Sequence, residues 1–293
     1  MRPSQGYRLC VRILTLNILA EREGYSARAE VLRTVLRDLD ADVVALQETV
    51  VRSGHDQVAD LLSGEYHVVH GQLREADGTG ISIASRWPVR SRWDRVLPSS
   101  LRVPQGEFSH QLLAVLVEPA SMGPVLVASP KPTFRLGHEV EREAMTVVAA
   151  RAVEDLLDEC DAAHVVLASD FDGVPDSASM RFWRGLQSLD GFSVAYADAL
   201  EVVHGAEAAG MWTFDPRRND LVTAPWRTTL PRQIDHVLVR CGPKGPTLEI
   251  RDARVVLDQP VDGVWASDHF GVLATLAEPA RPSRRASRPR SPR

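Results

Sequence analysis

The sequence of 293 residues contains very little lysine and cysteine. Only Lys131 and Lys244 are lysines among its 34 basic residues, so 32 are arginines. This bias is typical of a GC-rich genome, and the arginine content is therefore weak evidence for a binding function. The cysteines lie far apart, with no CxxC pair, so a disulfide-rich scaffold is excluded. We expect incidental or buried thiols in a reducing compartment at Cys10, Cys160 and Cys241.

Long apolar runs are also missing. No stretch approaches the about 20 residues that a membrane-spanning helix needs. Near the N-terminus, a short apolar stretch is interrupted by Asn17 and by the charged residues 21–23, so no leader segment is expected. We therefore expect a cytoplasmic protein that is a monomer and has no membrane partner.

Acidic and basic residues are unevenly distributed. The formal net charge is −5, but residues 279–293 contain six arginines and no acid. Subtracting those six positive charges leaves −11 for residues 1–278. We expect one folded domain over 1–278 and a disordered arginine-rich tail over 279–293. The acidic domain argues against a nucleic-acid coat protein, whereas an enzyme that contacts nucleic acid stays open.

Apolar periodicity predicts alternating strands and helices, which is typical of an α/β domain. Ser26 is the expected N-cap of the first helix, whose apolar stripe includes Leu32, Leu36 and Leu39. The continuous apolar run 42–47 indicates a strand buried on both faces. Strands are expected at 10–19, 42–47, 81–84, 111–117, 125–128, 165–168, 234–240 and 270–276, and helices at 26–39, 55–62 and 139–159, with a short one after Asp176.

Acid, amide and imidazole side chains recur at the ends of these strands. In open α/β sheets, ligands bind at such strand ends. Carboxylates and amides without a thiolate are the ligands that a hard cation such as Mg²⁺ or Mn²⁺ prefers. Each residue taken singly is more often structural than functional, but their recurrence indicates one site. The segments are Asn17, Gln47-Glu48, Ser169-Asp170-Phe171-Asp172, Asp235-His236 and Ser267-Asp268-His269.

In order and spacing, five motifs resemble those of the endonuclease/exonuclease/phosphatase family across roughly residues 9–277. The resemblance implies an α/β four-layer sandwich of the DNase I-like type, in which two mixed, mainly antiparallel β-sheets pack face to face with helices outside. Any one motif is weak evidence, whereas five in order are strong. They are Thr15-Leu16-Asn17, Val44-Ala45-Leu46-Gln47-Glu48, Ser169-Asp170-Phe171-Asp172 with Pro175-Asp176-Ser177, Ile234-Asp235-His236 and Ser267-Asp268-His269.

The resemblance also implies a Mg²⁺- or Mn²⁺-dependent phosphoesterase that hydrolyses a phosphodiester or phosphomonoester by in-line attack of water. Glu48 is the expected principal metal ligand, with Asn17 beside it and Asp268 contributing. The ion would neutralise phosphate oxygens as charge develops on them. The substrate stays open between a nucleic acid, a nucleotide and a small phosphorylated metabolite.

Four further residues carry the catalytic roles that the resemblance implies. Asp170 orients or deprotonates the attacking water and must be anionic to do so. His269 donates to the phosphate, and Asp235 holds its other ring nitrogen and favours the imidazolium. Asp172 stands where the family usually has Asn, which contacts phosphate or metal.

Two positions depart from the family pattern in a way that bears on activity. After the 125–128 strand the family carries a histidine, or in some members a tyrosine, and we expect Pro130 at that position. Because proline offers no side-chain donor or acceptor, the alternative is a non-catalytic member that binds a phosphorylated ligand or a partner. Lys131 is the candidate substitute, and His138 is a more distant one. Ser169 replaces the usual glycine and either is tolerated or narrows the site.

Arginines and aromatic residues alternate in the loop-like segment 211–232. Near a phosphate site such side chains bind a base or a phosphate backbone, so Trp212 and Arg232, together with Lys131, are the candidate substrate contacts. An ordinary surface loop in an arginine-rich protein is an equally good interpretation. The other members of the segment are Arg217, Arg218, Trp226 and Arg227.

Overall fold

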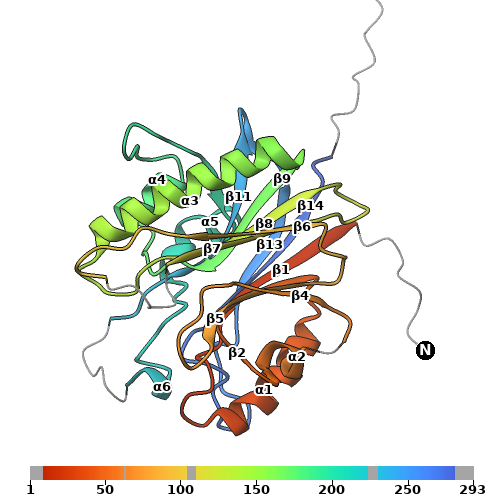
Figure 1. Ribbon diagram of the computed structural model, residues 1–293, viewed down its shortest axis with the longest axis vertical. Helices are drawn as coiled ribbons and strands as arrows, with labels where there is room; N and C mark the ends of the chain where they lie inside the picture. Colours follow the sequence, from red (N-terminus) through yellow and green to blue (C-terminus); the bar gives the residue numbers. More distant parts are fainter. Residues whose placement is uncertain (1–8, 63, 104–109, 224–229, 281–293) are drawn as a thin grey trace, which may run out of the picture.

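The computed structural model describes residues 9–62, 64–103, 110–223 and 230–280. Within these ranges, two seven-stranded β-sheets pack face to face (Figure 1). Helices α1 (Tyr25–Leu39) and α2 (Gln57–Leu61) cover the outer face of the first sheet. Helices α3 (Glu139–Cys160) and α4 (Ala178–Trp183) cover the outer face of the second. The α/β four-layer sandwich expected from the sequence is confirmed.

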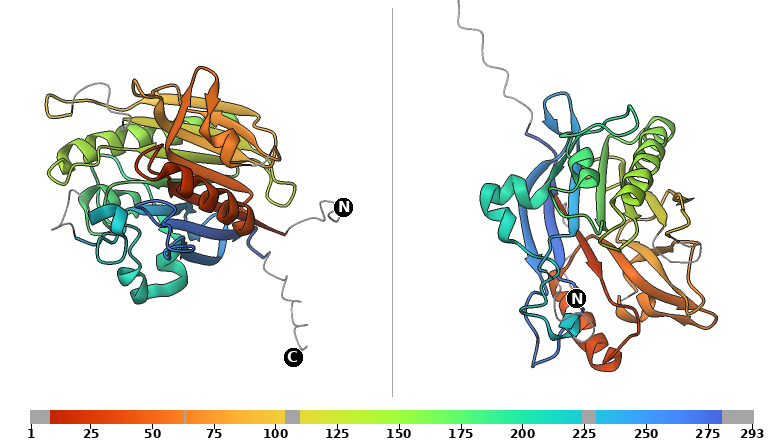
Figure 2. Two further views of the ribbon diagram at one scale, coloured as in Figure 1. Left: turned by 90° about the horizontal axis from the view of Figure 1, so that it is seen from below. Right: turned by 90° about the vertical axis from the view of Figure 1, so that its left-hand side faces the viewer.

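The first sheet places the two ends of the described chain side by side, with β1 next to β14 (Figure 2). Its order is β13-β14-β1-β2-β5-β4, with β3 paired to the end of β2. Only β1 and β2 among these pairs are parallel. The strands are β1 (Cys10–Asn17), β2 (Val43–Arg52), β3 (His55–Asp56), β4 (His67–His70), β5 (Thr79–Ser85), β13 (Glu249–Val256) and β14 (Gly271–Ala277).

The second sheet repeats this plan, with one parallel pair joined by a helix. Its order is β10-β11-β9-β8-β7-β6, with β12 paired to β11. β8 and β9 are parallel, and α3 connects them. The strands are β6 (Ser91–Val96), β7 (Gln111–Val117), β8 (Val125–Lys131), β9 (His164–Asp170), β10 (Tyr196–Asp198), β11 (Asp235–Gly242) and β12 (Gly245–Pro246).

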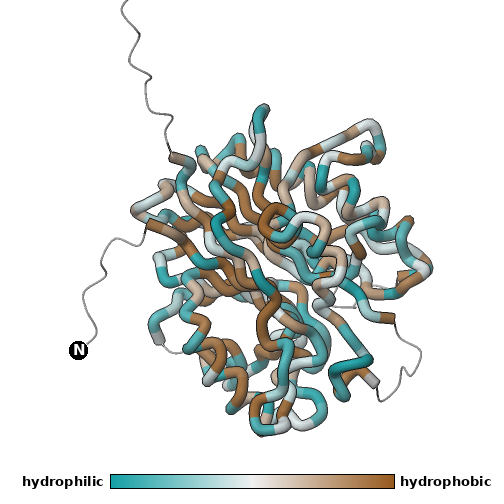
Figure 3. The backbone as a smooth tube through the Cα atoms, turned by 180° about the vertical axis from the view of Figure 1, so that it is seen from behind, coloured by the Kyte–Doolittle hydropathy of each residue, from teal (hydrophilic) through white to brown (hydrophobic). Residues whose placement is uncertain are grey.

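Three apolar cores hold the four layers together. Alternate residues of both sheets, such as Ile13 and Val127, form the core between the sheets. The opposite faces pack against the helices, as where Leu32 and Leu36 of α1 meet Leu14. Figure 3 shows that many of the more hydrophobic stretches of the backbone run through the middle of the molecule. Both sheets are therefore covered on two faces, which explains their nearly continuous apolar sequences.

Several expected boundaries are corrected by the structure. Ser26 is not the N-cap of α1, because Gly24 takes that position with φ 67° and no side-chain hydrogen bond caps the helix. The expected helix at 55–62 begins with the short strand β3, and Asp56 caps α2. The sequence analysis did not predict β4, β6, β10 or β13, which are short or lie at sheet edges, where one face is exposed.

The remaining helices lie in the second half of the chain. They are α5 (Ala199–His204), the 3-10 helix η1 (Gly205–Gly210) and α6 (Asp220–Thr223), so the segment 211–232 is not entirely a loop. No helix in the described ranges is both long enough and apolar enough to cross a membrane. Residues 281–293 of the expected arginine-rich tail lie outside the described residues.

Candidate active site

The strand-end motifs converge at one end of the sandwich. Parallel pairing of β1 with β2 sets Asn17 level with Gln47. Antiparallel pairing of β9 with β11 sets Asp170 opposite Asp235. His269 precedes β14, which runs antiparallel to β1 and therefore starts at this same end. A hydrogen bond of 3.1 Å from Nδ2 of Asn17 to Oδ2 of Asp170 joins the two sheets across the site.

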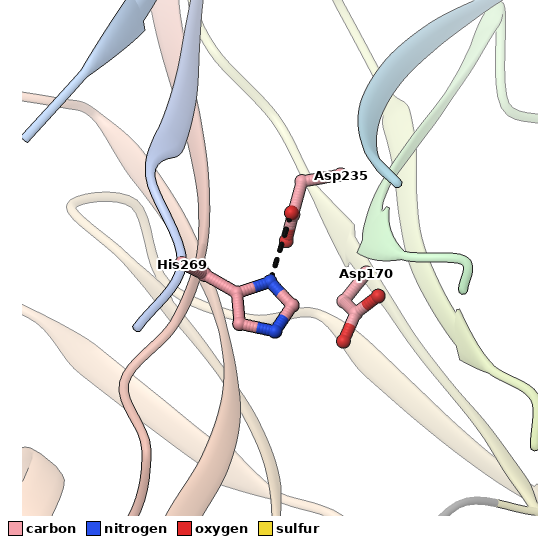
Figure 4. A group of neighbouring side chains, drawn as sticks. All are labelled: Asp170, Asp235 and His269. Atoms are coloured by element: carbon pink, nitrogen blue, oxygen red, sulfur yellow. Dashed lines mark hydrogen bonds and ion pairs between the residues drawn. The ribbon is translucent and has the colours of Figure 1, made fainter. Parts of the chain in front are cut away.

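His269 and Asp235 form a buried pair. Nδ1 of His269 donates to Oδ2 of Asp235 at 2.9 Å, and the Asp170 carboxylate lies beside the ring (Figure 4). Burial lowers the pKa of His269, but the carboxylates of Asp235 and Asp170 outweigh it and raise that pKa to about 10. The imidazole is therefore protonated at neutral pH, and Nε2 is the ring nitrogen left to donate to a substrate oxygen.

Asp170 is held as an anion by its neighbours. Burial raises the pKa of its carboxyl, but the Lys131 ammonium, the His269 imidazolium and the Asn17 amide together lower that pKa to about 2. The ammonium lies 3.1 Å from Oδ2, and the backbone N–H of Asp172 donates to Oδ1 at 3.0 Å. Both carboxylate oxygens therefore have donors that fix their direction.

Glu48 projects into the site from an irregularity in β2. The pairing of β2 with β5 shifts register between Gln47 and Thr49, and Glu48 has φ 56°, an uncommon conformation for a residue other than glycine. The side chain is thereby directed toward Asn17, whose Nδ2 donates to Oε1 at 3.1 Å. A strained backbone at a buried strand end is more often found at functional positions than elsewhere.

The group around Glu48 fits a hard cation. Removal from water raises the pKa of Glu48, and the nearby Asp268 carboxylate raises it further. A divalent ion would relieve this repulsion, and the carboxylate oxygens of Glu48 and Asp268 are donors it prefers. The amide oxygen of Asn17 accepts from the backbone N–H of Leu19 at 3.0 Å, so it would have to share this contact with an ion. Asp268 accepts a hydrogen bond from the Ser267 hydroxyl at 3.2 Å, which fixes its orientation. The ligand roles of Glu48, Asn17 and Asp268 stay predictions.

A second group satisfies the distances of a metal site but not its chemistry. One donor atom each from Asp170, Asp235 and His269 lie within 4.8 Å of one another. Nδ1 of His269 is already committed to Asp235, however, by the hydrogen bond of 2.9 Å. We therefore interpret this group as the acid and base pair of the site rather than as a metal centre.

The structure corrects the expected position of Pro130. Side chains alternate along β8, so Val127, Ser129 and Lys131 face the other sheet, while Pro130 faces α3. Pro130 there lines a small apolar space with Leu97 and Met145. The inward position that follows Ser129 belongs to Lys131, which is 1% exposed. The inward residue at the end of β8 is therefore a buried lysine, whereas Pro130 packs on the side of α3.

Lys131 contacts both aspartates of the Ser169–Asp172 motif. Its ammonium lies 3.1 Å from Oδ2 of Asp170 and forms a closer ion pair with Oδ2 of Asp172. Burial lowers the pKa of Lys131, but the two carboxylates outweigh it and raise that pKa. The extra negative charge that Asp172 brings, relative to asparagine, is thus balanced by Lys131. Asp172 has φ 51°, which Asn and Asp tolerate better than other side chains.

Ser169 has a local structural role that the sequence analysis left open. Its hydroxyl donates to the carbonyl oxygen of Pro130 at 2.7 Å, just beyond the last paired residues of β8 and β9. The hydroxyl of Ser129 donates in turn to the hydroxyl oxygen of Ser169 at 3.1 Å. Ser169 therefore ties the ends of the two strands together, which positions both Lys131 and Asp170.

Of the two candidate substrate contacts in 211–232, only Arg232 reaches the site. Arg232 and Asp172 line a cavity of about 280 Å³, together with Gly173 and Ser177. The Arg232 guanidinium also lies over the Phe214 ring, 4.8 Å from its centre. Trp212 instead lies near the Arg217 guanidinium, at 6.0 Å, and does not line this cavity. Trp226 and Arg227 lie outside the described residues.

His138 is not a substitute for the missing histidine. Its Nδ1 is hydrogen-bonded to the Thr133 hydroxyl at 3.2 Å, at the N-terminus of α3. None of the contacts that define the site includes His138. The expectation that it lies near the phosphate site receives no support from this position.

Two buried residues support the site in ways that the sequence analysis did not predict: Arg28, which no motif includes, and His236, which a motif includes without a role. Arg28 of α1, 1% exposed, donates to backbone carbonyls of the segment after β1 and to that of Ala266. His236 bonds Asp198 at 2.6 Å through Nδ1, and its Nε2 contacts the carbonyl oxygen of Gly173 at 3.3 Å. A signal for Arg28 was present, since it continues the four-residue step of Leu32 and Leu36 on the buried face.

Comparisons with known proteins agree with this geometry. The model of the endonuclease/exonuclease/phosphatase family matches residues 14–269. A Caenorhabditis elegans TDP2 structure superposes with a TM-score of 0.71 at 16% identity, covering 92% of this chain and 75% of that one. D. rerio TDP2 complexed with single strand DNA product gives 0.68 at 19% identity, covering 91% and 98%.

A third similar structure is the human Nocturnin catalytic domain with bound sulfate anion, with a TM-score of 0.66 at 16% identity, covering 92% of this chain and 95% of that one. At such identities the likeness is one of fold. A search of curated protein sequences found no match.

Proposed function

Because the chain belongs to the endonuclease/exonuclease/phosphatase family, we propose that it is a divalent-metal-dependent phosphoesterase that hydrolyses a phosphodiester or phosphomonoester by in-line attack of water. The observation that carries this proposal is the buried group in which the anionic Asp170 lies beside the protonated His269 and its partner Asp235. The substrate classes are a nucleic acid, a nucleotide and a small phosphorylated metabolite.

The carboxylate Asp170 is placed to direct the attacking water. A group with a pKa of about 2 is a weak base at neutral pH, so its main contribution is orientation rather than proton removal. Glu48, Asn17 and Asp268 would hold Mg²⁺ or Mn²⁺, which when bound supplies positive charge to phosphate oxygens.

Two fixed positive groups are available for the charge that develops on the phosphate. His269 offers Nε2–H while Asp235 keeps the ring protonated and oriented. Lys131 provides a buried ammonium that lies 3.1 Å from Oδ2 of Asp170. In a site shielded from water, such preorganised donors contribute about 3–4 kcal/mol each to transition-state stabilisation.

The cavity beside Asp172 is the proposed place for the rest of the substrate. Arg232 and Ser177 line it, and Leu136 and Val174 add apolar walls. A guanidinium suits a further phosphate or a base, so Arg232 is a proposed substrate contact. Trp212 has less support because it lies by Arg217. One similar structure carries single strand DNA product, which makes nucleic acid a substrate class to test.

The alternative, a non-catalytic member that binds a phosphorylated ligand, rested on Pro130. Pro130 faces α3, and Lys131 takes the inward position and lies 3.1 Å from Asp170, so a charged donor is present in the site. Ser169 in place of the family's usual glycine also supports this alternative.

The test is turnover of bis(p-nitrophenyl) phosphate and p-nitrophenyl phosphate with Mg²⁺, with Mn²⁺ and with a chelator. We expect metal-dependent turnover that falls about 10²–10⁴-fold in Asp170→Asn and in His269→Gln. Asp190→Asn is the matched control, because Asp190 is exposed and its φ of 49° suits asparagine. Turnover that persists in both site variants would refute the assigned mechanism. Binding of inorganic phosphate without turnover of either ester would favour the non-catalytic alternative.

A further inference from the structure

The Lys131 ammonium occupies a cation position between two carboxylates. It lies 3.1 Å from Oδ2 of Asp170 and closer still to Oδ2 of Asp172. Lys131 and Asp170 are each 1% exposed, and Asp172 is 8% exposed. Two carboxylates that converge on one point out of water need a positive charge there, and a divalent ion is the usual occupant.

Phosphoester hydrolases often bind two metal ions about 3.5–4 Å apart, which together stabilise the attacking and leaving oxygens. In this chain Glu48, Asn17 and Asp268 form the proposed first metal group. A second ion would need further carboxylates nearby. Asp170 accepts from the Asn17 amide at 3.1 Å, and Asp172 shares the Lys131 ammonium with it. Their inner oxygens already face the ammonium.

The ammonium is held in this position by the strand that carries it. Lys131 is the last residue of β8 and pairs with Gln111 of β7, within a strand that is buried throughout. The Ser169 hydroxyl further fixes the neighbouring carbonyl of Pro130. An arriving ion would therefore have to displace a buried charge from a rigid element, against the repulsion between two cations.

We propose that Lys131 is a built-in substitute for a second metal ion, so that this chain binds one divalent ion in its site. The proposal rests on the proposed function, because it presupposes the metal group at Glu48. It also gives a reason for Asp172 in place of asparagine. A buried lysine needs a second carboxylate as its partner, whereas a metal ion could be bound by one carboxylate and a neutral amide.

The test is a titration of the full chain with Mn²⁺, in which calorimetry counts the bound ions and electron paramagnetic resonance reports whether they are coupled. We expect one ion per chain and the spectrum of an isolated Mn²⁺ in the wild type. Lys131→Met frees Asp170 and Asp172, so we expect two ions and a spectrum with spin coupling, as for ions about 4 Å apart. Lys131→Gln serves if the methionine variant does not fold, with the same expected result.

Matched variants separate charge from position. Lys244→Met removes the other lysine of the chain, which is exposed, and should leave one ion bound. The double variant Lys131→Met with Asp172→Asn removes the second carboxylate as well, so the second ion should bind at least about tenfold more weakly than in Lys131→Met.

The outcomes distinguish this inference from the proposed function. Two coupled ions in the wild type would overturn the inference and leave the metal-dependent phosphoesterase standing. One ion in the wild type and also in both Lys131 variants would overturn it as well, because the lysine would not be what limits the number. No bound ion in any variant would overturn both the inference and the proposed metal dependence.

Discussion

Replacing Arg28 by methionine removes the buried charge that ties two segments of the site together. Its guanidinium lies 2.9–3.4 Å from six backbone carbonyl oxygens, one of which belongs to Ala266, just before the segment that carries Asp268 and His269. The other five follow Asn17 at the end of β1. These acceptors are Ile18, Leu19, Ala20, Arg22 and Glu23.

The expected cost follows from these acceptors. Methionine keeps most of the apolar stem of Arg28, so the loss is mainly that of hydrogen bonds to a charged donor. A buried carbonyl left without a partner costs about 1–3 kcal/mol, and entering water satisfies some of the six. If two or three stay without partners, the free energy of unfolding falls by about 3–5 kcal/mol. For a domain of this size, that lowers the melting temperature by about 10 °C.

The assay is urea unfolding followed by circular dichroism, with Arg33→Met as the matched control. Arg33 lies on the same helix, is exposed and bonds only the carbonyl of Asp60 among the contacts resolved for it. Its replacement should change the free energy of unfolding by no more than about 0.5 kcal/mol. Because Arg28 connects the segments of Asn17 and Asp268, Arg28→Met should also weaken Mn²⁺ binding by about tenfold.

If the free energy of unfolding of Arg28→Met lies within about 1 kcal/mol of the wild-type value, the carbonyls have found other partners at little cost, and the stabilising role of Arg28 is refuted. Loss of stability without any change in Mn²⁺ affinity would show that Arg28 stabilises the fold but does not position the metal group.

Four further predictions concern the site. The Asp235 carboxylate is the main cause that raises the pKa of His269 to about 10, and Asp235→Asn removes it. In a pH–rate profile, the pH at which kcat/KM falls on the alkaline side should therefore decrease by about one unit or more. The charge of His269 also stabilises the folded state. This contribution is complete below the usual histidine pKa of 6.5 and is lost as pH rises through about 10, so the free energy of unfolding of the wild type should decrease as pH rises from about 6.5 to 10. Pro130→His should raise turnover no more than twofold, because residue 130 faces α3, and a large gain would contradict the assigned register. Arg232→Ala should raise KM for a substrate with a second phosphate about tenfold while kcat stays within about threefold, and an equal fall in kcat would place Arg232 in the chemistry instead.

Much of the site was predictable because strand ends are readable from a single sequence. A strand buried on both faces is a continuous apolar run, so the polar residue at its end is conspicuous, as with Asp170. Glu48 follows such a run in the sequence, although β2 continues beyond it to Arg52. Parallel and antiparallel pairing then bring such ends to one edge, and the order of the motifs indicated the fold. Bulges, edge strands and helix caps were less predictable, because tertiary packing decides them, as at Gly24 and in β13.

The orientation of Pro130 and Lys131 could not be fixed from the sequence. Side chains alternate along a strand, so a shift of one residue in the assumed end of β8 exchanges the inward and outward faces. The apolar run alone does not define that end, since Pro130 and Lys131 are themselves inside the strand. Pairing of Gln111 with Lys131 and of Leu112 with Pro130 settles it.

Lys131 and Asp172 are therefore better understood as one coupled pair. Relative to neutral side chains, Lys131 adds a buried positive charge, and Asp172 adds a negative one beside Asp170. Each change alone is costly because an unpaired buried ion pays several kcal/mol of desolvation. Together they form the Lys131–Asp172 ion pair, which leaves the local charge unchanged and fixes an ammonium against Asp170. It follows that a chain with only one of the two substitutions should be less stable than a chain with both or with neither.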